Sequence, residues 1–128
     1  MLIDHGTEGY GVLLWGTLGA AGWFGVVAMQ LVRFAEVGLP ANSTDRHIWR
    51  FAQAHGMFLL TNNRNMDDVD SLEQTLRDEN TLTSLPVLTI GRIDRMTEPG
   101  YREACAARLL EIVLYPADYL GAGRLYIP

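Results

Sequence analysis

Acidic and amide side chains gather at three places in this sequence, each at the boundary of a predicted element. Asp4 follows a short apolar segment, and Asp45 lies at the predicted start of a helix. The third place directly follows the apolar run 57–61, where the candidate residues are Asn63, Asn65, Asp67 and Asp68. Carboxylates that share a cleft repel one another, and Mg²⁺ or Mn²⁺, which prefer oxygen ligands, relieve that repulsion. A metal held there could orient a water molecule for attack on a phosphodiester.

The order of the predicted elements determines whether these residues can meet. The patterns of apolar residues, helix caps and glycines predict an alternation of strands and helices. Strands are expected at 1–4, 24–32, 57–61, 86–90 and 125–127, and helices at about 7–21, 44–55, 71–78 and 98–114. This alternation predicts an α/β fold of three layers, α/β/α, with a mainly parallel twisted sheet, in a single domain over residues 1–128. Ligands of such sheets bind beyond the carboxyl ends of the strands, where Asp4 and the 61–68 segment are expected.

Composition narrows the classes of function. The net charge is −5, the wrong sign for holding nucleic acid by bulk electrostatics, so any such contact must be local or metal-mediated. All ten basic residues are Arg, which excludes a Schiff-base lysine and the lysine of a Walker-type phosphate loop. Cys105 is the single cysteine and has no partner for an intramolecular disulfide, which favours a reducing cytoplasm.

An uncharged stretch runs from Gly9 to Val32 and is long enough to cross a bilayer. Six glycines, the polar Gln30 and a change from helix-like spacing to a β-branched run after Gly22 argue against a membrane span. We therefore expect no membrane-spanning segment.

Three segments carry a resemblance to a known family. They are LID at 2–4, NSTDRHIWRFAQAHG at 42–56 and FLLTNNRNM at 58–66. Over roughly residues 1–68 their order and spacing resemble the short bacterial PIN-like proteins related to the nuclease components of toxin–antitoxin pairs. That family typically shows an apolar strand ending in Asp, an Asp that opens a helix, and an apolar strand running into Thr, Asp, any residue, Asp and an aromatic residue.

The resemblance implies a PIN-like fold and a metal-dependent ribonuclease, the toxin-like member of a pair whose antitoxin-like partner blocks the site. It implies Mg²⁺ or Mn²⁺ as cofactor, RNA as substrate, and Asp4, Asp45, Asn63 and Asn65 as catalytic and metal-binding residues. Asp67 is a further expected metal ligand, because it or Asp68 lies close enough in sequence to replace a missing acid. Arg64, between two asparagines, is expected to contact a phosphate of the substrate.

The sequence departs from the family in ways that bear on activity. Both acids of the third motif are replaced, by Asn63 and Asn65, and His5 stands where an acid is common. An Asn can bind a hard cation through its carbonyl oxygen, but it contributes no negative charge and cannot act as a general base. The alternative function is therefore a catalytically inactive PIN-like module that binds a protein or a nucleic acid through the old cleft.

Several residues also have structural interpretations. Asp45 suits a helix N-terminus, where the helix dipole favours a carboxylate, and the Asn-rich run suits a turn. Arg64 could equally be a solvated loop residue, and Gly-Ala-Gly-Arg at 121–124 lacks the third glycine and the following helix of a phosphate loop. A homodimer surface could use apolar side chains, with five candidates: Trp15, Trp23, Leu109, Ile112 and Tyr115. For most of these five, a position in the core is the favoured alternative.

Overall fold

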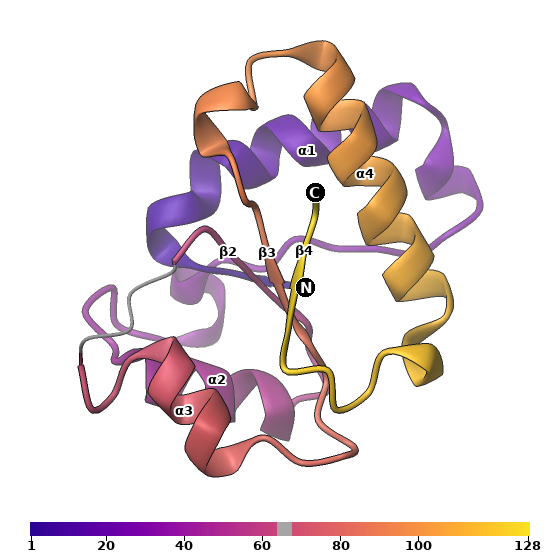
Figure 1. Cartoon of the computed structure of the whole chain (residues 1–128). Helices are drawn as coiled ribbons and strands as arrows, with labels where there is room; N and C mark the ends of the chain where they lie inside the picture. The colour runs from indigo at the N-terminus through magenta and orange to yellow at the C-terminus, as the bar shows by residue number, and fades with distance from the viewer. Residues whose placement is uncertain (64–67) are drawn as a thin grey trace.

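The computed structural model describes residues 1–63 and 68–128 and has an all-parallel sheet between two layers of helices (Figure 1). The strands are β1 (Leu2–Ile3), β2 (Leu59–Thr61), β3 (Val87–Thr89) and β4 (Arg124–Tyr126), in the spatial order β1-β2-β3-β4. The helices are α1 (Glu8–Ala20), α2 (Asp45–Ala54), α3 (Leu72–Glu79) and α4 (Pro99–Leu114). The predicted α/β class and parallel sheet are therefore confirmed.

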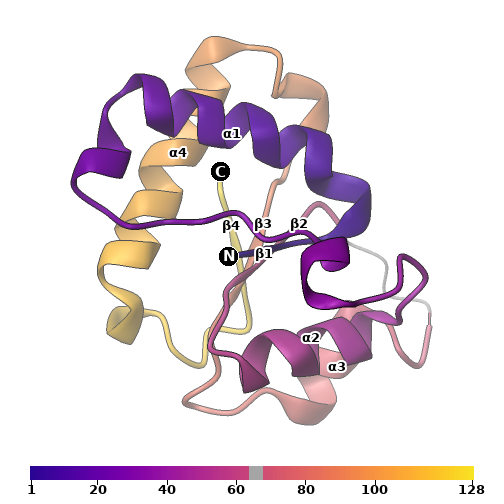
Figure 2. The same ribbon diagram turned by 180° about the vertical axis from the view of Figure 1, so that it is seen from behind.

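Alternation along the strands divides the core in two. Ile3, Leu60 and Leu88 point into a cluster shared with α1 and α4. Their neighbours Leu2, Leu59 and Val87 point into a second cluster, shared with α2 and α3. Because side chains along a strand face opposite sides in turn, each helix pair covers one face, and Figure 2 shows the two pairs on either side of the sheet.

The predicted strand at 24–32 is wrong over most of its length. Gly22 has a φ of 80°, and a 3₁₀ turn follows at Trp23–Gly25. Val26 is 76% exposed, whereas Met29 and Leu31 pack only partly against the core, so the run is not covered on both faces as a buried strand requires. Among the described residues of this run, only Val32 pairs with the sheet, through a parallel bridge to Leu2.

The bridge between Val32 and Leu2 shows where the chain reverses the direction in which it adds strands to the sheet. Ile3 donates its backbone N–H to Val32, whereas Leu2 and Asp4 donate theirs to Phe58 and Leu60 on the opposite side. The chain thus leaves β1 toward one edge and later returns on the other side of β1 to form β2. The carboxyl ends of β1 and β2 lie at this switch point, the usual position of a ligand in open α/β sheets. We call this edge of the sheet, beyond the ends of β1 and β2, the crevice.

The helix ends follow from local sequence. The Thr44 hydroxyl accepts the N–H of His47 at 3.2 Å and caps α2, and Ser71 caps α3 in the same way through Gln74. Gly56 adopts a φ of 64° directly after α2, as a C-terminal glycine does. The cap at Thr44 and the stop at Gly56 agree with the predicted helix at 44–55, and α3 agrees with the predicted helix at 71–78.

Two of the residues predicted for a homodimer surface lie in the core. Leu109 and Ile112 are fully buried on α4 against the sheet, so they are not available for a dimer surface and follow the alternative expectation of a core position. Trp15 is half-buried against the same cluster, whereas Trp23 and Tyr115 are exposed. Among the described helices, none is both long and apolar enough to cross a membrane.

Candidate functional site

Asp4 is held at the carboxyl end of β1. Its backbone N–H bonds the carbonyl of Leu60 at 2.9 Å, which continues the pairing between β1 and β2. Its carboxylate atom Oδ2 accepts the hydroxyl of Thr61 at 2.7 Å. Thr61 is the last residue of β2 and is buried. The first predicted acid is therefore fixed at the switch point by the neighbouring strand.

Asp45 is brought to the same edge by α2, of which it is the first residue. Its Oδ2 accepts two hydrogen bonds, from the side-chain amide of Asn63 at 2.8 Å and from the backbone N–H of Leu72 at 3.1 Å. Leu72 is the first residue of α3, so the carboxylate joins the start of one helix to the start of the next. The expected helix-terminal role and the expected site role of Asp45 are thus compatible.

The electrostatics of Asp45 reflect its neighbours. Burial raises the pKa of its carboxyl group above the ordinary value, and the charges of Asp4 and Asp68 raise it further. The hydrogen bonds from Asn63 and Leu72 act in the opposite direction, because they stabilise the ionised form. The negative charges of Asp4 and Asp45 therefore oppose each other at this edge of the sheet, and a cation bound near them would relieve that repulsion.

Asn63 connects the two acids. Its backbone N–H bonds the Thr61 hydroxyl at 2.9 Å, and that hydroxyl donates to Asp4. Its side chain reaches Asp45, so a continuous chain of hydrogen bonds runs from one carboxylate to the other. Asn62, one residue earlier, faces the other way and accepts the hydroxyl of Thr7 at 2.7 Å. The alternation of the strand thus selects Asn63, and not Asn62, for the crevice.

Arg124, at the start of β4, contacts residues beside the candidate site. It was not among the site residues predicted from the sequence. Its side chain is only 7% exposed and donates from Nε to Glu73 on α3 at 2.7 Å. Its Nη1 bonds the backbone carbonyl of Asn63 at 2.6 Å and the Thr89 hydroxyl at 2.8 Å. The only sequence signal was an arginine at the start of a predicted apolar strand, where an unpaired charge would be costly.

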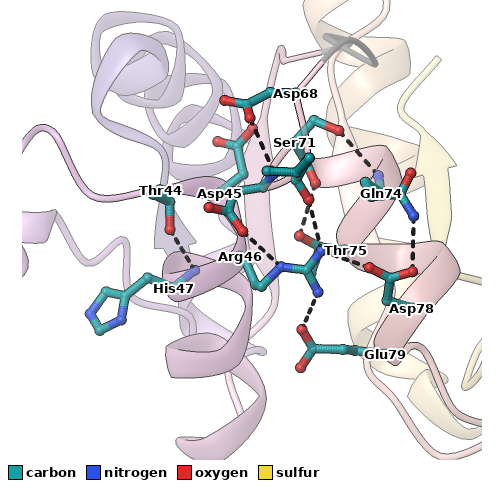
Figure 3. A network of polar contacts seen from close by, with 12 residues as sticks. Thr44, Asp45, Arg46, His47, Asp68, Ser71, Gln74, Thr75, Asp78 and Glu79 are labelled. Carbon is teal, nitrogen blue, oxygen red and sulfur yellow. Dashed lines mark hydrogen bonds and ion pairs between the residues drawn. The ribbon is translucent and has the colours of Figure 1, made fainter.

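An ion-pair network fixes α3 against α2, as Figure 3 shows for Arg46 and its partners on α3. Arg46 pairs with Asp78 at 2.8 Å, with Asp70 at 3.0 Å and with Glu79. The carboxylates hold the pKa of Arg46 above its ordinary value. Because Asp45 and Arg46 are adjacent on α2, the network sets the distance between Asp45 and the first N–H of α3.

The predicted site residues divide into two groups. The structure brings together Asp4, Asp45 and Asn63, whereas Arg64, Asn65 and Asp67 lie outside the described residues. Asp68 is exposed and acts on Asp45 through its charge. Within the described ranges 1–63 and 68–128, no group of three His, Cys, Asp or Glu side chains is arranged to share a metal ion.

The donor set fits a hard cation only in part. Two carboxylates and a hydroxyl at one edge are oxygen donors of the kind that Mg²⁺ and Mn²⁺ prefer. Asn63, however, donates its amide N–H to Asp45, so only its carbonyl oxygen could serve a cation as a ligand, and it adds no negative charge.

Comparisons of the chain with models of known protein families, with curated proteins and with solved structures find no match.

Proposed function

We propose that this chain is a PIN-like, Mg²⁺- or Mn²⁺-dependent ribonuclease with a degenerate acidic site. The observation that carries the proposal is the meeting of Asp4 and Asp45, from two different elements, at the switch point of a parallel sheet. Burial and, to a smaller extent, the charge of Asp4 raise the pKa of Asp45, and a cation bound beside the two carboxylates would offset both effects. The order of the three segments at 2–4, 42–56 and 58–66 along the chain also supports a PIN-like nuclease.

Asp4 and Asp45 would hold the metal, with the carbonyl oxygen of Asn63 as a neutral ligand. When bound, the ion would supply an activated water and neutralise charge that develops on a phosphodiester. Asp4 is kept in place by Thr61, and Asp45 by Leu72, so neither carboxylate needs to reorganise. The resemblance adds three proposals for residues 64–67: Asn65 and Asp67 as ligands and Arg64 on a phosphate. It also adds an antitoxin-like partner and a cytoplasmic location.

The second candidate is an inactive PIN-like module that binds a protein or nucleic acid through the crevice. The contact from the Asn63 amide to Asp45 favours it. An N–H donor relieves the charge of Asp45 without any metal, a relief that an Asp at this position would not give. The two candidates therefore differ in whether the site binds Mn²⁺.

A Mn²⁺ titration of the wild type and of Asn63→Asp decides between the candidates. Under the nuclease proposal the wild type binds Mn²⁺, and Asn63→Asp binds it about tenfold more tightly or better, because ligand charge governs the affinity of such sites. Without metal, the added carboxylate lowers the stability of the variant by roughly 1–2 kcal/mol, which Mn²⁺ restores. Cleavage of single-stranded RNA should depend on Mn²⁺ and disappear in Asp4→Asn.

Asn62→Asp is the matched control, because it adds the same charge one residue away, on the face that contacts Thr7. It should leave the Mn²⁺ affinity within about threefold of the wild type. A wild type that neither binds Mn²⁺ nor cleaves RNA, with an Asn63→Asp variant that binds it, would favour the inactive module. Absence of Mn²⁺ binding in both proteins would contradict the proposed site itself.

A further inference from the structure

The outer side of α1 is apolar. Gly11, Leu14 and Leu18 bury the inner side of the helix, as a covered helix requires. On the outer side, however, Val12 is 65% exposed and Leu13 is 41% exposed. The helix has no charged residue after Glu8 with which to keep an exposed face in water. An uncovered face of this composition indicates a contact surface.

A groove between α1 and α4 extends this surface. Its first half is lined by Val12, Leu13, Gly16 and Ala20 of α1, with Arg102 and Glu103 of α4. Its second half shares Thr17, Ala21 and Glu103 with the first, so the two halves are continuous. The second half ends at four apolar side chains: Trp23, Leu110, Leu114 and Tyr115. Figure 2 shows α1 lying across α4 at the outside of the molecule.

The pattern of large and small residues along α1 fits a second copy of the same helix. Gly16 is exposed, and a Cβ added to it would meet no atom within 4 Å. In an antiparallel pair with its two-fold axis at Gly16, residue 12 of each copy faces residue 20 of the other. Val12 would then lie over Ala20 of the second copy, large against small, on both sides of the axis. A two-fold interface requires this self-complementarity.

The charges at the groove are also self-complementary. Glu103 is exposed and, within residues 1–63 and 68–128, has no ion-pair partner. Arg102 lies beside it and uses Nη1 to bond the carbonyl of Met96 at 2.8 Å. A two-fold arrangement would bring Arg102 of each copy toward Glu103 of the other. An anionic membrane surface is disfavoured, because the groove contributes no excess of positive charge.

The area is close to what a stable dimer needs. The exposed apolar side chains of this face are Val12, Leu13, Trp23, Phe24, Leu114 and Tyr115. They offer roughly 500 Å², and the small residues of the groove floor add to this, against about 800 Å² per partner in a standard interface. An apolar patch of that size is at the upper end for a monomer, where the largest patches are about 300–600 Å².

We propose that the α1–α4 face is the interface of a homodimer, in which two α1 helices pack antiparallel about Gly16 with Val12 over Ala20. The inference is independent of the proposed nuclease function, because it uses residues of α1 and α4, none of which belongs to the candidate site.

Sedimentation analysis of the full chain over a wide concentration range tests the proposal. The wild type should reach twice the chain mass of 14.3 kDa. Val12→Glu would bury a charge at the interface and should raise the dimer Kd at least about tenfold. Ala20→Arg should do the same from the opposite half of the contact. Circular dichroism establishes that each variant remains folded.

Leu82→Glu is the matched control, because Leu82 is 89% exposed and lies outside this face. It should dimerise like the wild type. Glu103→Arg should weaken the dimer, and the swap Arg102→Glu/Glu103→Arg should restore it. A wild type that stays monomeric, a dimer that Val12→Glu leaves intact, or a monomer that instead binds neutral phosphatidylcholine vesicles would each overturn the proposal.

Discussion

Asp45 is subject to two opposing effects within a single side chain. Its place in the first turn of α2 favours a negative charge, because the N-terminus of a helix carries a partial positive charge. Burial and the charge of Asp4 oppose ionisation, and they leave the pKa of Asp45 raised. The two hydrogen bonds from Asn63 and Leu72 reduce this rise without cancelling it. Ionised Asp45 therefore lowers the stability of the folded protein, and a bound cation would offset this effect.

The free energy of unfolding should therefore depend on pH through the ionisation of Asp45. A folded-state pKa above the unfolded value means that the contribution of Asp45 is fully present below its ordinary value of 3.8 and is lost as pH rises through the folded pKa. Asp45→Asn removes this loss, so the stability of the variant relative to the wild type should increase from about pH 4 to pH 7. We expect an increase of a few tenths to about 1 kcal/mol, because the carboxylate is half-buried and water screens part of the repulsion. Urea denaturation across this range measures it.

Asp94→Asn is a control of opposite sign. The ion pair with Arg92 lowers the pKa of Asp94, so its contribution to stability is present above the ordinary value and is lost as pH falls. The stability of this variant relative to the wild type should therefore decrease over the same rise in pH. Two variants with the same trend would contradict the assignment of the raised pKa to Asp45.

At the scale of elements, local signals predicted the helices well. Thr44, Ser71 and Gly56 mark their ends through side-chain caps or a positive φ, which depend only on neighbouring residues. The strand at 24–32 was mispredicted because apolar composition cannot reveal whether anything covers it. Arg124 was missed because its contact with Asn63 spans 61 residues of sequence. Asp4 and Asp45 could be paired in advance because strand ends and helix starts meet at one edge of a parallel sheet.

The glycines of α1 provide a test at this scale. Gly9 has open space for a Cβ, so Gly9→Ala should stabilise the protein by about 0.5 kcal/mol through helix propensity. Gly11 lies against the buried Ile3, whose Cδ1 would be 3.0 Å from the new Cβ, and against Leu31 at 3.1 Å. Gly11→Ala should therefore be less stable than Gly9→Ala by about 1 kcal/mol or more. Equal stabilities in thermal denaturation would contradict this close packing of α1 on β1.

At the scale of the whole molecule, the sheet separates the two proposed surfaces. The acidic crevice is built from the strand ends and from α2 and α3, and the dimer face from α1 and α4. Helices α1 and α4 pack in one hydrophobic cluster and α2 and α3 in the other, and Leu2 and Ile3 of β1 contribute one side chain to each. Dimerisation on one face therefore leaves the crevice open to a large substrate such as single-stranded RNA.

This separation predicts that changes on the two faces are energetically independent. Val12→Glu should weaken the dimer and leave the Mn²⁺ affinity unchanged. Asn63→Asp should raise the Mn²⁺ affinity and leave the dimer Kd unchanged. In the double variant, the free energy of dimerisation should equal that of Val12→Glu, and the free energy of Mn²⁺ binding should equal that of Asn63→Asp. Both should agree within about 0.5 kcal/mol, as expected for distant sites without shared partners. Mn²⁺ titration and sedimentation of the four proteins complete the cycle. A coupling of about 1 kcal/mol or more would contradict independence, and the 3₁₀ turn His5–Thr7, which joins Asp4 to α1, would be the first segment to examine for its route.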